Sequence, residues 1–96
     1  MTSRDEYQQL AEAKLEEISA KIQQFKAQAK QADAKARIEI ERHIDQLQDR
    51  KALVQSKLSD LKKAGENAYA ELKAGMETAL NDMKTALEEA AAKFKV

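Results

Sequence analysis

Apolar residues recur every three or four positions along almost the whole chain. The series begins at Tyr7, ends at Phe94, and has Lys51 as its one charged member. Its 24 steps cover 87 residues, or about 3.6 residues per step, which is the period of a straight α-helix. The pattern predicts an all-α protein with one continuous apolar stripe. The larger apolar members of this stripe are Leu15, Ile18, Ile22, Phe25, Ile40, Ile44, Leu47, Val54, Leu58, Leu61, Leu72, Met76, Leu80, Met83, Leu87 and Phe94.

Signals for helix ends occur at the N-terminus and near Gly65. Ser3 and Glu6 have the S-x-x-E spacing of a capping box, which predicts a helix start at about Ser3. Two lysines precede Gly65, and Asn67 follows it, which is the usual order of a helix stop and a new start. We therefore predict one module of residues 1–96, with a first helix at about 3–64 and a second at about 68–94. Gly65 is expected to be a left-handed hinge, with Asn67 as the cap of the second helix.

Three arrangements are consistent with this stripe. In a helical hairpin, the second helix packs antiparallel on Ile40–Leu61, and the small residues Gly75 and Ala79 permit a close approach. In an extended rod, the helix continues through Gly65, because the stripe keeps its phase there and a helical glycine costs only about 1 kcal/mol. A three-helix bundle needs a turn near Gln31–Lys35, where the sequence is strongly helix-forming and lacks Gly, Pro and Asn.

The favoured hairpin leaves part of its stripe uncovered. The second helix is less than half as long as the first, so the stripe from Tyr7 to about Ile22 would face water. An exposed apolar strip of this size predicts a partner. The expected partner is another copy in a homo-oligomer, a different helical protein or an anionic membrane surface. Leu10, Ile38 and Leu53 lie off the stripe, and are either scattered surface residues or the edge of a second contact face.

Composition excludes several functional classes. The 17 basic and 17 acidic residues balance, so no basic field for nucleic acid is expected. Opposite charges recur at i,i+4 spacing, as at Asp33 and Arg37, which indicates a solvated helix face. There is no cysteine and no apolar run of transmembrane length. The start of the chain lacks the pattern of a signal peptide, so we expect a cytoplasmic protein, either free or peripheral to a membrane.

Candidate chemistry is sparse. We expect no catalytic site, metal site or cofactor, and no enzymatic activity. The single histidine, His43, has Glu39 four residues before it, which makes a poor metal half-site, so a charge-assisted helix pair or a His shielded by a partner helix is expected. Lys51 lies in the middle of the stripe, where it either fixes register or extends its ammonium to water.

Lysines mark the edges of the stripe in the last third of the chain. Lys62, Lys73 and Lys84 recur every eleven residues along one edge, and Lys93 lies near the other. This arrangement resembles the amphipathic helices of exchangeable apolipoproteins and of late-embryogenesis-abundant proteins. Residues 36–95 as a whole resemble small bacterial coiled-coil proteins of unassigned function. The first resemblance implies a lipid-surface protein, and the second implies a fold. We expect a structural or interaction protein that self-associates through the stripe, with lipid-surface binding as the alternative.

Overall fold

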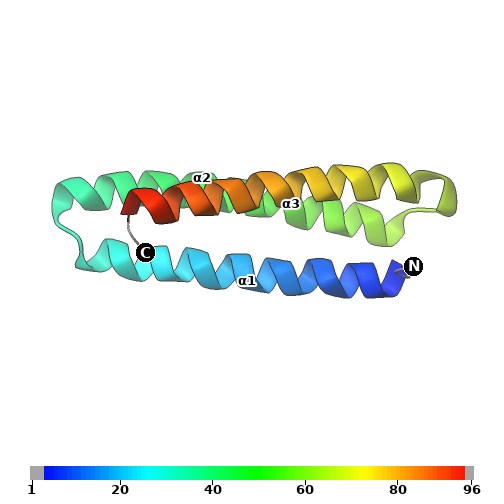
Figure 1. Cartoon of the computed structure of the whole chain (residues 1–96), viewed down its shortest axis with the longest axis horizontal. Coiled ribbons are helices and arrows are strands. Elements are labelled where there is room, and N and C mark those ends of the chain that lie inside the picture. Colours follow the sequence, from blue (N-terminus) through cyan, green and yellow to red (C-terminus); the bar gives the residue numbers. More distant parts are fainter. Residues whose placement is uncertain (1–3, 95–96) are drawn as a thin grey trace.

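The protein is a bundle of three long helices. The computed structural model describes residues 4–94, in which α1 (Arg4–Gln31), α2 (Ala34–Lys63) and α3 (Glu66–Phe94) follow one another without a strand. The helices run up, down and up, so α1 and α3 are parallel and α2 is antiparallel to both (Figure 1). The bundle measures 51 × 18 × 17 Å. The predicted all-α class is confirmed, whereas the capping box at Ser3 lies outside the described residues.

The predicted uninterrupted helix of residues 3–64 is wrong. The chain turns back at Ala32 and Asp33, within the Gln31–Lys35 segment that only the three-helix alternative required. The Asp33 backbone is extended, and its carboxylate accepts a hydrogen bond of 2.9 Å from the Ala36 amide. Asp33 is therefore the N-cap of α2, and a capping aspartate can end a helix run without any glycine or proline.

Arg37 closes the same turn from the other side. Its guanidinium donates to the carbonyl oxygens of Ala29 at 3.1 Å and Ala32 at 3.4 Å, and so satisfies acceptors left free at the end of α1. Asp33 and Arg37 do not act as the surface ion pair that their spacing predicts. One caps the start of α2, and the other caps the end of α1.

The predicted break at Gly65 is confirmed, but its geometry differs. Ala64 is extended, with φ −71° and ψ 141°, and the φ of Gly65 lies outside the left-handed region. The Gly65 carbonyl accepts hydrogen bonds from the amides of Ala68 and Tyr69, so α3 already begins at Glu66. Asn67 lies within the first turn of α3 and is not its cap.

The predicted antiparallel packing of the last helix on α2 is also confirmed. Ala79 is buried in the core. A side chain added at Gly75 would meet the Lys57 ammonium at 3.7 Å, which is an ordinary contact, so the packing does not require glycine there.

The apolar stripe forms the core of this bundle. Each helix turns its part of the stripe to the centre, and the largest fully buried side chains are Ile22, Leu47, Val54, Leu61, Met76 and Met83. Leu15, Leu72, Leu80 and Phe94 pack at its margin and remain partly exposed. Within residues 4–94, no charged or polar side chain is buried, and Lys51 is half-exposed at the core's edge. The core thus contains no polar residue that would fix its register.

Candidate interaction surface

The three helix pairs of the bundle are not packed equally. α2 packs closely along both α1 and α3, whereas the backbones of α1 and α3 approach each other at hardly any position. The reason is that the apolar stripe on α1 is only wide enough to cover the contact with α2 and the centre of the bundle. Charged residues therefore occupy the α1 positions that are turned toward α3.

A groove of about 760 Å³ runs along this open seam, and we call it the α1–α3 groove. Ile18 and Leu87 form its buried floor, with Leu10 and Leu80 beside them. Leu10 is 51% exposed, although it is a large apolar residue. The charged residues of the walls are Lys14, Glu17 and Lys21 on α1, and Glu77, Asp82, Lys84 and Glu88 on α3. An apolar floor between charged walls is the usual anatomy of a protein-binding groove.

Tyr7 closes one end of the groove. This residue is 7% exposed, and its ring lies 4.7 Å from the ammonium of Lys73, a cation–π distance. Its buried hydroxyl has no hydrogen-bond partner among the described residues. Burial, the negative charge of Glu77 and the neighbouring Tyr69 together raise the pKa of this hydroxyl above 10.0. The phenol is therefore held in its neutral form.

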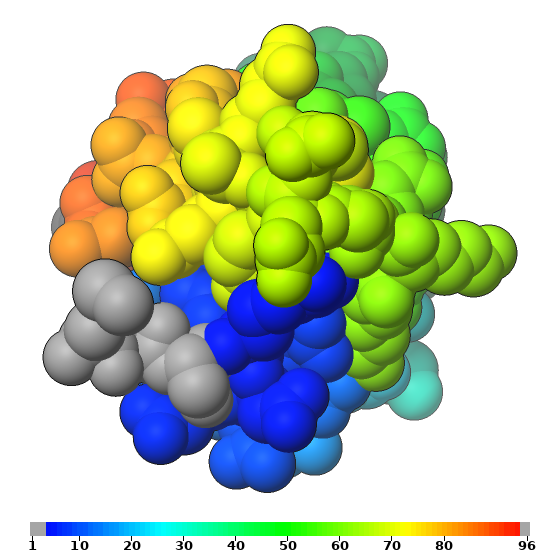
Figure 2. Space-filling view, turned by 90° about the vertical axis from the view of Figure 1, so that its right-hand side faces the viewer, coloured from blue at the N-terminus to red at the C-terminus, as the bar shows by residue number. Residues whose placement is uncertain are grey.

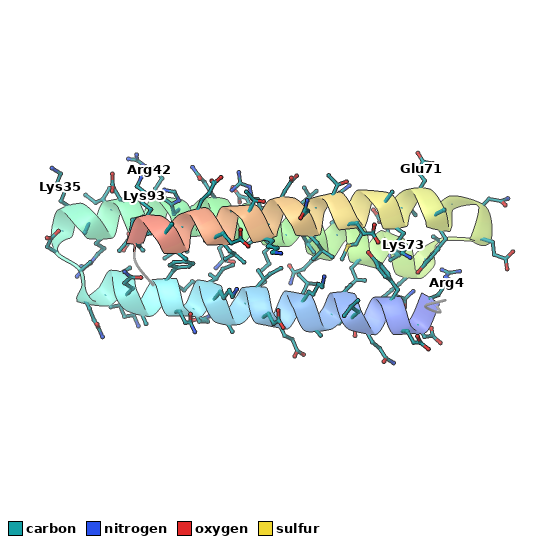
Figure 3. All side chains as sticks on the ribbon, viewed as in Figure 1. Arg4, Lys35, Arg42, Glu71, Lys73 and Lys93 are labelled. Carbon is teal, nitrogen blue, oxygen red and sulfur yellow. The ribbon has the colours of Figure 1, made fainter. Side chains whose placement is uncertain are left out.

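Arg4 joins all three helices at the same end. Its guanidinium donates 2.8 Å to the Ala64 carbonyl at the end of α2 and lies 4.5 Å from the ring of Tyr69 on α3. The start of α1 accordingly lies against the turn between α2 and α3 (Figure 2). In Figure 3, Arg4 and Lys73 lie on this side of the molecule, whereas Glu71 points away from α1.

A second contact closes the seam at the opposite end. The Gln28 amide donates 2.7 Å to the Phe94 carbonyl, and the other amide atom, Oε1, is buried without a partner among the described residues. The ring of Phe94 also meets His43 of α2 edge-on at 5.1 Å. α1 and α3 are therefore tied together at both ends and separated in the middle, where the groove lies.

The structure places the predicted site residues differently from the sequence interpretation. The stripe residues, predicted as an exposed self-association surface, are buried or half-buried inside one chain. The hinge at Gly65 and Asn67 lies at the end of the bundle. Three of the four edge lysines have partners within the chain: Lys62 pairs with Glu12 at 2.5 Å, Lys73 faces Tyr7, and Lys93 lies 5.9 Å from the Phe94 ring. The fourth, Lys84, lines the groove.

Within residues 4–94, no group of three or more histidine, cysteine or acidic side chains could hold a metal ion. No helix in that range is both long enough and apolar enough to cross a membrane. His43 is half-buried against Phe94, which agrees with the expectation of a histidine shielded by a helix.

Sequence reasoning did not identify the α1 wall of the groove. A signal for it was present, because Leu10, Lys14, Glu17 and Lys21 follow one another at helical spacing beside the main stripe. Leu10 was interpreted as a scattered surface residue or the edge of a second contact face. The groove makes the second interpretation relevant.

The chain matches no known protein family, no curated protein and no solved structure. The resemblances to coiled-coil proteins and to apolipoprotein-like helices therefore remain predictions, and what can be inferred about function rests on the α1–α3 groove.

Proposed function

We propose that this chain is a non-enzymatic structural and interaction protein that self-associates through the α1–α3 groove. The observation that carries the proposal is the open seam: α2 covers both neighbouring helices, and the groove between those two has an exposed Leu10 and a half-exposed Leu80 beside its buried apolar floor. A bundle with one open seam gains free energy when another molecule covers it, because apolar surface is removed from water.

The location of Leu10 supports this surface over others. The large hydrophobic residues exposed within residues 4–94 are Leu10, Ile38 and Leu53. Ile38 and Leu53 belong to α2 and do not line the groove. A single exposed apolar residue on a convex helix is ordinary, whereas one beside a hollow can be enclosed by a partner.

A stable contact would have to extend beyond the groove. One whole face of the bundle, 51 Å long and 18 Å wide, projects about 900 Å², and a standard interface takes ~800 Å² from each partner, so a second molecule would have to cover most of that face. The lipid-surface alternative is less well supported, because the apolar stripe that would enter a membrane is buried in the bundle.

Sedimentation equilibrium tests the proposal, with Leu10→Asp as the variant and Leu53→Asp as its matched control. The two leucines are 51% and 52% exposed, so both substitutions should leave the fold intact, as judged by circular dichroism. In the dimer, each Leu10 would bury more of its exposed surface. Leu10→Asp removes this gain from both copies, which is about 2 kcal/mol in total, so the dissociation constant of the dimer should rise about 30-fold. Leu53→Asp should leave it nearly unchanged. A wild-type chain that stays monomeric even at millimolar concentration would refute self-association, and equal effects of both variants would refute the groove.

A further inference from the structure

The two walls of the α1–α3 groove carry opposite charges at matching heights. Gln28 and Phe94 touch across the seam 66 positions apart, and Tyr7 and Lys73 have the same separation. Residues of α1 therefore lie level with residues of α3 about 66 positions later. By this alignment, Glu17 is level with Lys84 and Lys21 is level with Glu88, each to within one residue.

Lys14 extends this pattern, because its level on α3 falls between Glu77 and Asp82. All of these charged side chains are exposed. No salt bridge joins the two walls in the part of the chain that the structure describes. The α1 wall thus presents the order plus, minus, plus, and the α3 wall presents minus, minus, plus, minus. Both orders remain available to a partner.

We infer that the groove receives a second copy of this chain, placed parallel to the first, with the two-fold axis running along the bundle. The inference rests on the proposed function and specifies its geometry. A rotation about such an axis brings α1 of one copy over α3 of the other without changing any residue's height. Glu17 then faces Lys84 of the second copy, and Lys21 faces Glu88 of the second copy. Because the dimer is two-fold symmetric, each of these pairs occurs twice.

One antiparallel register, centred on Glu17, places like charges together. A two-fold axis across the middle of the groove, level with Glu17, stacks α1 on α1 in reverse. Lys14 would then lie opposite Lys21 of the second copy, and Glu77 would lie near Glu88 or Glu89 of the second copy. Like charges in apposition oppose association, whereas complementary charges mainly fix the orientation of the partner. The charge pattern therefore favours the parallel dimer over this antiparallel register.

A charge-reversal series distinguishes the parallel dimer from the antiparallel register centred on Glu17 by the sign of the effect. In the parallel dimer, Lys21→Glu would place a negative charge opposite Glu88 of the second copy at two symmetry-related contacts. The dissociation constant of this variant should therefore rise about tenfold at low salt. Adding Glu88→Lys to it should return the constant to within about threefold of the wild type. In the antiparallel register centred on Glu17, Lys21→Glu would instead meet Lys14 of the second copy and tighten association. Tightening would overturn the inference.

Distance measurements between spin labels provide the closing test. The chain has no cysteine, so Asn67→Cys and Gln31→Cys each give one labelling site, at opposite ends of the bundle and on exposed positions. In the parallel dimer, both label pairs should be separated by less than two bundle widths of 18 Å. A separation near the bundle length of 51 Å would overturn the parallel arrangement while leaving self-association in place. The absence of any coupling between labels would instead overturn the proposed function itself.

Discussion

Asp33→Ala is the substitution that most directly tests the turn between α1 and α2. The carboxylate of Asp33 accepts a hydrogen bond of 2.9 Å from the Ala36 amide, and the Asp33 carbonyl accepts 2.8 Å from the Arg37 amide. Alanine keeps the backbone bond but removes the side-chain acceptor. It also removes a negative charge from the positive end of the α2 dipole.

The expected loss of stability is about 1 kcal/mol. Replacing a capping aspartate by alanine costs about 0.5–2 kcal/mol, and the exposure of Asp33 places this site near the middle of that range, since water partly replaces the lost acceptor. For a chain of this length, 1 kcal/mol corresponds to a fall of about 4–8 °C in the melting temperature.

The sign of the effect distinguishes the three-helix bundle from a continuous helix. If residues 31–35 were helical, Asp33 would lie inside a helix, where alanine is the better residue by about 0.5 kcal/mol. The substitution would then stabilise the protein. The assay is urea unfolding followed by circular dichroism, with the free energy of unfolding extrapolated to water.

Two controls isolate the cap. Asp33→Asn retains a side-chain acceptor of equal capping strength and should change stability by no more than a few tenths of a kcal/mol. Asp49→Ala, at an exposed position inside α2, should stabilise the protein slightly. If Asp33→Ala behaves like Asp49→Ala, Asp33 is not a cap and the turn at Ala32–Asp33 is wrong.

Three further outcomes follow from the packing. Leu47→Ala, at a 2% exposed position, should cost about 2–5 kcal/mol in urea unfolding, whereas Leu53→Ala should cost less than about 0.5 kcal/mol; similar losses would contradict the assignment of the core. Gly65→Asp should stabilise the chain by about 0.5–1 kcal/mol by calorimetry, because a side chain there meets nothing within 4 Å and can cap α3; a lower melting temperature would mean that Gly65 is strained. The wild-type protein should lose stability above pH 10, because the pKa of Tyr7 is raised in the folded state and the unfolded chain therefore loses this proton first. Tyr7→Phe should make this loss smaller. An unchanged pH profile would show that the hydroxyl is not buried.

The turn at Ala32–Asp33 explains why the sequence interpretation stopped at two helices. The apolar series keeps its helical period across this segment, so periodicity gives no sign of a break. Local propensity gives none either, because alanine, lysine and glutamine favour helix on both sides. What decides the turn is tertiary: folding back lets α1 and α3 cover α2 and hides the stripe inside one chain. Burial of that stripe outweighs the few helical hydrogen bonds lost at the turn.

The sequence by itself determined the helical class, the break at Gly65 and most of the core. The buried residues Ile22, Leu47, Val54 and Met83 all belong to the stripe, since apolar residues at helical spacing must share a face. The tertiary structure alone widened that face to include Ala86 and Ala90, beside the Ala79 that the predicted helix packing already involved. It also decided that the stripe faces inward and that the seam between α1 and α3 stays open. Periodicity along one helix defines a face, but which neighbour covers that face depends on how the whole chain packs.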